Sequence, residues 1–181
     1  VVDAYSGELA KGPRPRFEDL WWYGWPSAFS REVGRATQAE GSVEPALVYS
    51  IMREESGYRP EAISPVGARG LLQIMMATGE VLAEGQGLET FKADDLFLPR
   101  INIALGADYL TELTAKFDGR LSASIASYNA GPEAVQEWLP EGAPSSELAR
   151  DDEWVESIPY EQTRNYVKRV LRSLHVYRTL Y

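Results

Sequence analysis

Two long stretches of this 181-residue chain repeat their apolar side chains every three to four residues. In residues 100–117 the apolar positions are 101, 105, 109, 110, 113 and 117. Towards the C-terminus they are Tyr166, Val167, Val170, Leu171, Leu174 and Tyr177. This spacing predicts helices that bury one face in a shared core. No alternating run is long enough to predict a strand, so the expected fold is mainly α-helical, with at most a very small β element in residues 62–95.

Proline, glycine and capping residues predict where shorter helices begin and end. Ser42 is the expected N-cap of a helix that has Pro45 in its first turn and ends near Ser56, with Gly57 as C-cap. Residues 140–153 are polar, acidic and broken by Pro and Gly, which predicts an exposed loop. The other predicted helices cover residues 27–40, 71–83, 122–129 and 132–139, and the last begins near Pro159.

The N-terminal residues 1–26 differ from the rest, and we expect them to be a connector or the remnant of a preceding region. The run Gly12-Pro13-Arg14-Pro15 breaks any helix there. An aromatic cluster follows, which caps the core or stacks on sugars: Trp21, Trp22, Tyr23 and Trp25. Residues 27–181 are long enough for one compact domain.

Composition excludes several classes of partner and site. Cysteine is absent, which removes disulfides and thiolate metal sites. The net charge is −9 and no Lys/Arg run occurs, so nucleic acid is not an expected partner. No stretch has the roughly 20 apolar residues of a membrane span, and residues 1–20 lack signal-peptide order. His175 is the single histidine, with no acidic cluster around it, and no metal or other cofactor is expected.

Glu55 is the most informative position because it continues an apolar helical stripe formed by Val48, Ile51 and Met52. A carboxyl group on such a stripe is partly withdrawn from water, and it lies near the negative end of the helix dipole. Both effects raise its pKa, which suits a general acid. The alternative is that Glu55 leans outward or pairs with an arginine, for which the candidates are Arg53, Arg59 and Arg69.

Four segments resemble the signature motifs of the soluble lytic murein transglycosylases. They are Arg53-Glu54-Glu55-Ser56, the run from Ser64 to Met75 with Gly70-Leu71-Leu72-Gln73, the run Ser127-Tyr128-Asn129-Ala130-Gly131-Pro132, and Val155-Glu156-Ser157-Ile158-Pro159-Tyr160 followed by Thr163-Arg164-Asn165-Tyr166-Val167. The resemblance covers roughly residues 24–181. It implies a lysozyme-like helical domain with a long groove for the glycan, over residues 27–181.

The resemblance also implies a role for each matching residue. Glu55 is the single catalytic acid/base, and Tyr128 hydrogen-bonds near its carboxyl group or near the substrate acetamido group. Asn129 supports the part of the groove beside Tyr128 and Glu55, and Glu156 lies on the groove wall. Ser64 and Gln73 lie in the groove beside the sugars, and Met75 forms part of its apolar floor.

Simpler alternatives remain for three of these residues. In the alternative for Met75, its side chain packs in the hydrophobic core. In the alternative for Glu156, its carboxylate lies at a helix N-terminus, where the helix dipole favours it. Tyr128 is then a packed aromatic whose hydroxyl meets a backbone carbonyl. The chain departs from the family pattern at Met76, where proline is usual, at Gly79, where alanine is common, and at Gln162, where glutamate is usual.

The activity implied by the resemblance is non-hydrolytic cleavage of the MurNAc-β-1,4-GlcNAc bond of peptidoglycan, with 1,6-anhydro-MurNAc ends as product. The substrate acetamido group assists, and no cofactor is needed. Two alternatives stay open, a goose-type lysozyme that hydrolyses the bond and a non-catalytic wall-binding module. The resemblance further implies glycan strands as the partner, an extracytoplasmic and periplasmic location, a monomer, and a lost N-terminal domain.

Overall fold

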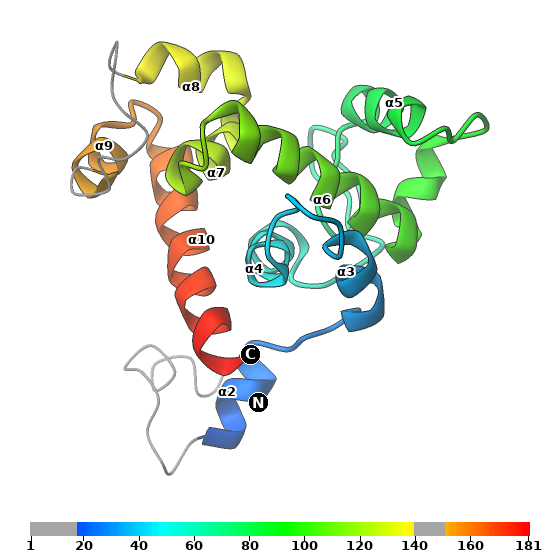
Figure 1. The fold of residues 1–181 in the computed structure, drawn as a ribbon, viewed down its shortest axis with the longest axis horizontal. Helices are drawn as coiled ribbons and strands as arrows, with labels where there is room; N and C mark the ends of the chain where they lie inside the picture. Colours follow the sequence, from blue (N-terminus) through cyan, green and yellow to red (C-terminus); the bar gives the residue numbers. More distant parts are fainter. Residues whose placement is uncertain (1–17, 140–150) are drawn as a thin grey trace.

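Helix α4 (Pro45–Ser56) lies at the centre of the fold. A computed structural model describes residues 18–139 and 151–181, and in it the other helices surround α4 (Figure 1). Val48, Ile51 and Met52 of α4 are completely buried. Helix α10 (Glu161–Leu180) packs along one side of α4, and α3 (Ser30–Ala36) and α6 (Pro99–Lys116) pack against it elsewhere.

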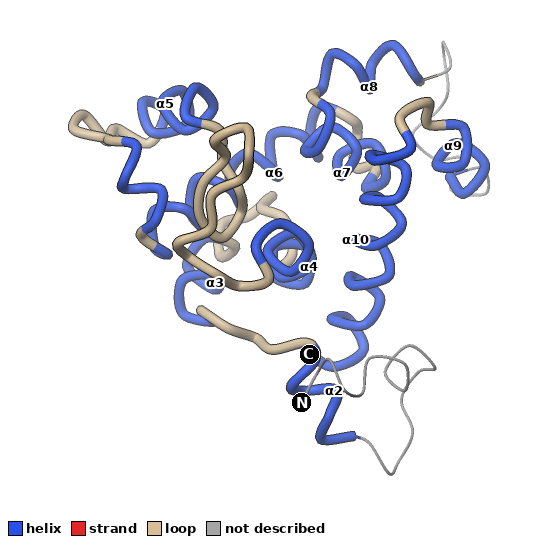
Figure 2. The backbone as a smooth tube through the Cα atoms, turned by 180° about the vertical axis from the view of Figure 1, so that it is seen from behind, coloured by secondary structure: helices blue, strands red, loops and turns tan. Residues whose placement is uncertain are grey.

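Helices account for almost all the regular structure in residues 18–139 and 151–181, which confirms the predicted mainly α class (Figure 2). Two isolated β-bridges, between Ile63 and Arg69 and between Arg69 and Ile74, are the small β element. The remaining helices are α2 (Glu18–Gly24), α5 (Met76–Gly85), the 3-10 helix η2 (Ala93–Phe97), α7 (Leu121–Ala130), α8 (Pro132–Trp138) and α9 (Asp151–Ser157).

The two apolar stripes form the long helices α6 and α10, as predicted. In α10, Tyr166, Val167, Val170, Leu174 and Tyr177 are buried. The glycine positions are also confirmed, because Gly57 caps α4 in a left-handed conformation (φ 57°) and Gly131 separates α7 from α8.

Several predicted helix boundaries are wrong. The helix expected over residues 27–40 is the shorter α3, which spans Ser30–Ala36. Ser42 does not cap α4: the N-cap is Glu44, whose backbone is extended, and Pro45 occupies the first helical position. The helix expected from residue 71 begins only at Met76. Residues 71–73 form a turn instead, in which Gln73 adopts a positive φ of 47°. This conformation is incompatible with a right-handed helix.

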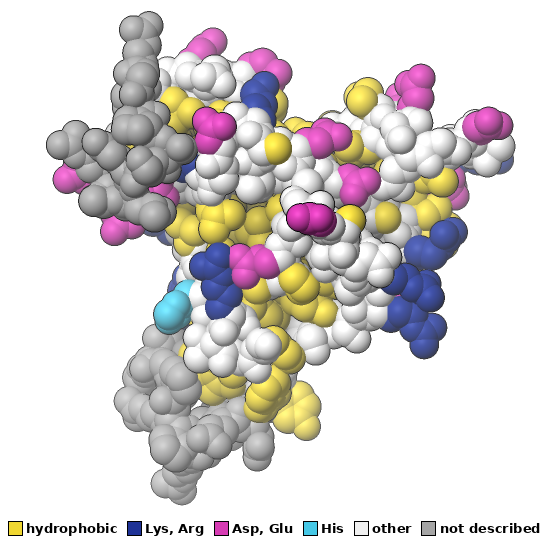
Figure 3. All heavy atoms as spheres, in the orientation of Figure 1, with side chains coloured by type: hydrophobic (Ala, Val, Ile, Leu, Met, Phe, Trp, Pro, Cys, Tyr) yellow, Lys and Arg dark blue, Asp and Glu magenta, His cyan; other side chains and the backbone are white. Residues whose placement is uncertain are grey.

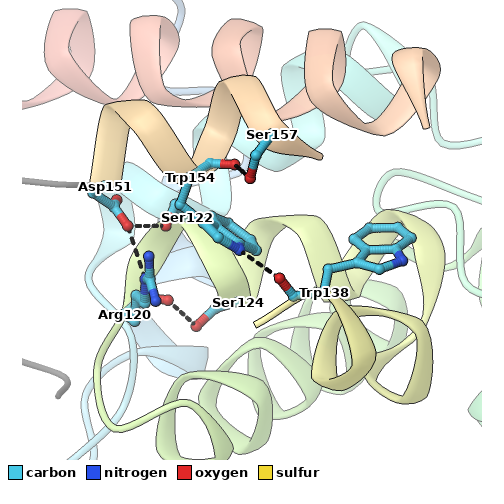
Figure 4. A network of polar contacts seen from close by, with 7 residues as sticks. All are labelled: Arg120, Ser122, Ser124, Trp138, Asp151, Trp154 and Ser157. Carbon is cyan, nitrogen blue, oxygen red and sulfur yellow. Dashed lines mark hydrogen bonds and ion pairs between the residues drawn. The ribbon is translucent and has the colours of Figure 1, made fainter. Parts of the chain in front are cut away.

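The predicted loop at 140–153 ends earlier than expected, because residues 151–153 begin α9. Asp151, at the helix start, accepts hydrogen bonds from Arg120 Nε (2.9 Å) and Ser122 Oγ (2.5 Å), as Figure 4 shows. The Arg120 guanidinium also lies over the Trp154 ring, 4.8 Å from its centroid. Acidic residues are favoured in the first turn of a helix, and α9 begins with three of them, Asp151, Asp152 and Glu153. Residues 140–150 of this prediction, and residues 1–17 of the predicted connector, lie outside the described residues.

The aromatic cluster attaches α2 to the core. Trp21 and Trp25 are buried and stack on each other with ring centroids 4.8 Å apart. Arg53 of α4 lies over the Trp25 ring at 4.5 Å and donates to the Gly24 carbonyl. Trp22 and Tyr23 are exposed. Trp21 and Trp25 therefore cap the core.

Buried Asn102 of α6 holds the turn that precedes α5. Its Oδ1 accepts from Leu72 N (2.8 Å), and its Nδ2 donates to the carbonyls of Arg69 (3.0 Å) and Leu96 (2.9 Å). Gly70 fits between these groups because it has no side chain: a Cβ there would lie 2.1 Å from the Leu96 oxygen. Asn102 thereby satisfies three buried backbone groups in and around this turn.

The described residues were also compared with the patterns of membrane-spanning helices and of metal sites. Within residues 18–139 and 151–181, no helix is long and apolar enough to cross a bilayer. The same residues contain no group of three or more metal-ligating side chains. Figure 3 shows one face, on which acidic side chains are dispersed over several helices.

Replacement of Asn102 by leucine is expected to destabilise the chain by about 3 kcal/mol, because three buried backbone groups lose their partner. Urea denaturation measures this loss. Asn165→Leu is the matched control on an exposed face of α10 and is expected to change stability by less than about 0.5 kcal/mol. Equal losses for both variants would contradict the assigned role of Asn102.

Candidate active site

Glu55 lies in the last turn of α4, half-buried at the end of the apolar stripe. Burial raises the pKa of its carboxyl group from 4.5 to about 7. A hydrogen bond from Tyr166 opposes this rise, the neighbouring carboxylate of Glu54 adds to it, and Arg169 opposes it more weakly. The carboxyl group therefore exchanges its proton near neutral pH, which is what a general acid requires.

None of the three arginines considered as partners pairs with Glu55. Arg53 donates to the Gly24 carbonyl, and Arg59 Nε donates to the Ser56 carbonyl at 2.9 Å. Arg69 forms an ion pair with Asp94 at 3.0 Å. The structure thus favours the inward-facing alternative for Glu55.

Tyr166 is the residue that binds Glu55; the sequence analysis placed it on the core stripe and in the fourth resembling segment, but gave it no role at Glu55. Its hydroxyl donates to Glu55 Oε1 at 2.6 Å. Burial and the nearby Glu55 carboxyl group raise the pKa of Tyr166 well above its ordinary value, so the phenol remains a donor. The sequence carried a chemical signal for this pair: a buried tyrosine needs a partner for its hydroxyl, and the half-buried Glu55 carboxyl group is an acceptor.

Tyr128 forms a hydrogen bond to the backbone and none to Glu55, whereas the resemblance implies one near the Glu55 carboxyl group or near the substrate acetamido group. Its hydroxyl donates to the Leu72 carbonyl at 2.7 Å, so the backbone alternative is the one observed. Its ring packs against Tyr109 of α6, with centroids 5.5 Å apart. Burial and then the charge of Glu55 raise the pKa of Tyr128 well above its ordinary value, so its phenol stays protonated.

Hydrogen bonds join the four resembling segments. Ser56, next to Glu55, donates to the Leu71 carbonyl at 2.8 Å. The Tyr128 bond to Leu72 brings the third segment to the same turn. Asn129 Oδ1 accepts from Thr163 Oγ1 of α10 at 2.8 Å. Since Tyr166 binds Glu55, all four segments meet around the end of α4.

Ser64 and Gln73 build the loop that leads into this turn. Ser64 Oγ accepts from the backbone N–H of Ala68 at 3.0 Å. Gln73 Nε2 donates to the carbonyls of Ala62 (3.1 Å) and Gly70 (2.8 Å), while its backbone is held at positive φ. A non-glycine residue in this conformation is strained, and such strain persists only where surrounding contacts fix it.

Met75 and Glu156 lie at the surface. Met75 is 44% exposed at the N-cap of α5, so the core alternative is wrong. Glu156 is exposed and pairs with Lys168 of α10 at 2.6 Å. It lies in the last turn of α9, so the helix N-terminus alternative is wrong as well.

The departures from the family pattern have local explanations. Met76 occupies the first position of α5, where proline is favoured but not required. Gly79 is buried, and a Cβ there would lie 3.1 Å from the Phe91 ring, so the aromatic ring takes the space of a methyl group. Gln162 is exposed in the first turn of α10.

A pocket of about 270 Å³ contains none of the predicted site residues. It lies on α5 and the following loop, and its lining combines three glutamates with apolar side chains: Glu80, Ala83, Glu84, Gly87, Leu88, Glu89 and Phe91. Glu55 and its partners belong to different elements, α4, α7 and α10. This pocket is therefore separate from Glu55 and its hydrogen-bond partners.

Known proteins resemble this chain in sequence and fold. Residues 32–147 match the family described as "Transglycosylase SLT domain". A soluble lytic murein transglycosylase of Salmonella typhimurium is 34% identical over 148 residues, which cover 81% of this chain and 22% of that protein. An inactive mutant of the lytic transglycosylase Slt from Pseudomonas aeruginosa has a similar fold, with a TM-score of 0.79, 32% identity, and coverage of 87% of this chain and 25% of that one.

The 70 kDa soluble lytic transglycosylase from Escherichia coli gives the same picture. Its TM-score is 0.79 at 33% identity, over 91% of this chain and 26% of that chain. The chain thus spans about a quarter of the length of the relatives it matches.

Replacement of Glu55 by glutamine is expected to change stability in a pH-dependent way. Because the pKa of Glu55 is raised in the folded state, its carboxyl group contributes stability that is fully present below about pH 4.5. This contribution is lost as the pH rises to about 7. At about 1.4 kcal/mol per pKa unit, the ionised carboxylate costs up to about 3 kcal/mol at pH 8. Glu55→Gln removes this cost, so its stability relative to the wild type should improve between pH 4 and pH 8. Urea denaturation at both pH values tests this, and an unchanged difference would contradict the burial of an ionisable Glu55.

Proposed function

The chain belongs to the family of transglycosylase SLT domains, and we propose that it cleaves the MurNAc-β-1,4-GlcNAc bond of peptidoglycan without water, with Glu55 as the single acid/base. The relatives are named as lytic murein transglycosylases, which supports the reaction class. The observation that carries the proposal is the half-buried Glu55 carboxyl group, which has a pKa of about 7 and is held by the Tyr166 hydroxyl.

The first step is proton donation to the glycosidic oxygen. Because Oε1 of Glu55 accepts from Tyr166, the proton of the neutral carboxyl group belongs on Oε2, which is left for the substrate. Transfer of this proton breaks the bond between C1 of the muramyl sugar and the glycosidic oxygen, which leaves as a hydroxyl group. The substrate acetamido oxygen stabilises the positive charge that develops at C1.

The second step returns the proton to Glu55. The carboxylate formed in the first step takes the proton of the C6 hydroxyl of the same muramyl sugar, and the C6 oxygen bonds to C1. The product is a 1,6-anhydro end, and Glu55 is neutral again. One carboxyl group is sufficient, in contrast to glycosidases that use two. The inactive mutant of the Pseudomonas aeruginosa enzyme carries a glutamine in place of one glutamate, which supports an essential glutamate in that enzyme.

The remaining site residues bind substrate or hold the site in this proposal. Ser64, Gln73 and Asn129 present neutral hydrogen-bonding groups to hydroxyl and acetamido groups, and exposed Met75 offers an apolar contact. Exposed Glu156 faces the muramyl sugar or its peptide. Tyr128 acts through Leu72, whose carbonyl it binds, and so shapes the wall beside Glu55.

We extend the proposal to the biological setting of the chain. Glycan strands of peptidoglycan are the partner, and an extracytoplasmic, periplasmic location follows from that substrate. Residues 27–181 form the catalytic domain, which acts as a monomer and on whose core Trp21 and Trp25 pack.

Digestion of purified peptidoglycan tests the reaction. The wild type is expected to release muropeptides with 1,6-anhydro ends, which mass spectrometry distinguishes from reducing ends by the mass of one water. Glu55→Gln should lower the rate by about two to four orders of magnitude, because the variant has no proton to donate. Reducing ends would identify a hydrolase of the lysozyme type, and binding without products from the wild type would identify a wall-binding module.

The rate is expected to fall as the pH rises through about 7, since Glu55 must be protonated. Tyr166→Phe removes a hydrogen bond that lowers the pKa of Glu55, so the alkaline fall should move to higher pH while the maximal rate decreases. Tyr177→Phe is the matched control: Tyr177 is another buried tyrosine of α10, and its hydroxyl donates to the Pro26 carbonyl at 3.1 Å. Equal profiles for both variants would contradict the role of Tyr166.

A further inference from the structure

One stripe of α10 binds both carboxyl groups at the end of α4. Tyr166, Arg169 and Ser173 are three and four residues apart, so they lie on the same side of the helix. Tyr166 donates to Glu55 (2.6 Å), whereas Arg169 Nε (2.9 Å) and Ser173 Oγ (3.3 Å) donate to Glu54. Adjacent residues of α4 are thus bound by adjacent turns of α10.

The two glutamates meet different partners. Glu54 is a carboxylate with only 15% of its side chain exposed, and it is paired with a guanidinium. Glu55 meets a neutral phenol. A carboxylate withdrawn from water is costly unless it is paired, so Glu54 depends on Arg169.

We propose that Arg169 is a positioning residue for the reaction of Glu55: through its ion pair with Glu54 it fixes the end of α4 against α10, so that the Glu55 carboxyl group stays on the Tyr166 hydroxyl. This role rests on the function proposed above for Glu55. Arg169 acts through Glu54 and is not itself placed on the substrate. Its guanidinium also offsets the charge of Glu54 beside the acid.

The groups that face Glu55 come from three helices. Glu54 of α4 raises the pKa of Glu55, and Arg169 of α10 lowers it. The phenols of Tyr166 on α10 and Tyr128 on α7 are neutral. The arginines Arg53, Arg59 and Arg69 are engaged with other groups. The opposing charges of Glu54 and Arg169 are therefore the ones that act on the pKa of Glu55.

A second ion pair joins the same two helices and serves as a matched control. Arg178 of α10 pairs with Glu44, the N-cap of α4, with Nε 3.1 Å from both carboxylate oxygens. Both of these side chains are exposed, and they lie at the opposite end of α4 from Glu55. Loss of this pair changes the packing of α10 on α4 without changing the charges beside Glu55.

The experiment compares Arg169→Ala, Arg169→Lys, Glu54→Gln, the double variant Arg169→Ala/Glu54→Gln, and the control Arg178→Ala. The pKa of Glu55 is measured by NMR of ¹³C-labelled glutamate side chains, with Glu55→Gln to assign the resonance. The rate of anhydro-muropeptide release is measured from about pH 5 to about pH 9, a range that brackets the titration of a general acid near neutrality. Circular dichroism melting curves establish that each variant is folded.

In Arg169→Ala, the pKa of Glu55 and the pH at which the rate decreases should both shift upward by about half a unit. The maximal rate should drop about tenfold. Glu54→Gln should lower the pKa, and the double variant should return it close to the wild-type value. Arg169→Lys should retain most of the rate, and Arg178→Ala should match the wild type in pKa and rate.

Arg169→Ala with the same pKa and rate as Arg178→Ala would overturn the proposal. Peptidoglycan left uncut by the wild type would refute the proposed function instead. The NMR titration would then still decide whether Arg169 controls Glu55, because it requires no turnover.

Discussion

The position of one carboxyl group at the end of a buried helix constrains the rest of this structure. α4 is surrounded by other helices, and its apolar stripe fixes the direction in which Glu55 points. Water is partly excluded there, so the neutral form of the carboxyl group is favoured up to about pH 7. The same burial that stabilises the core thus creates an acid that works near neutrality.

Neutral side chains of the surrounding helices hold the turn before α5. The turn before α5 exposes its backbone groups to Ser56, Asn102 and Tyr128, and each of these side chains satisfies one or more of them. Because these bonds come from α4, α6 and α7, the turn is fixed relative to Glu55 by three independent supports. None of the three side chains that hold this turn carries a charge.

Glu54 and Glu55 show how neighbours in sequence acquire different chemistry. Arg169 and Ser173 bind Glu54, so its charge is compensated. Tyr166 gives Glu55 a single neutral donor. The difference arises from the register of α10 on α4, because a shift of α10 by one turn would bring the guanidinium towards Glu55.

The sequence by itself determined the helical class, the long helices α6 and α10, the Gly57 cap and the special position of Glu55. Each of these follows from local periodicity or from the conformational freedom of one residue. Only the tertiary structure decided that Tyr166, and not Tyr128, binds Glu55, and that Gln73 lies in a strained turn where a helix was expected. These features depend on contacts between residues that are distant in the chain, such as 55 with 166 and 72 with 128. Periodicity reports which face of a helix is buried, but it carries no information about the partner that the polar end of a buried side chain will meet.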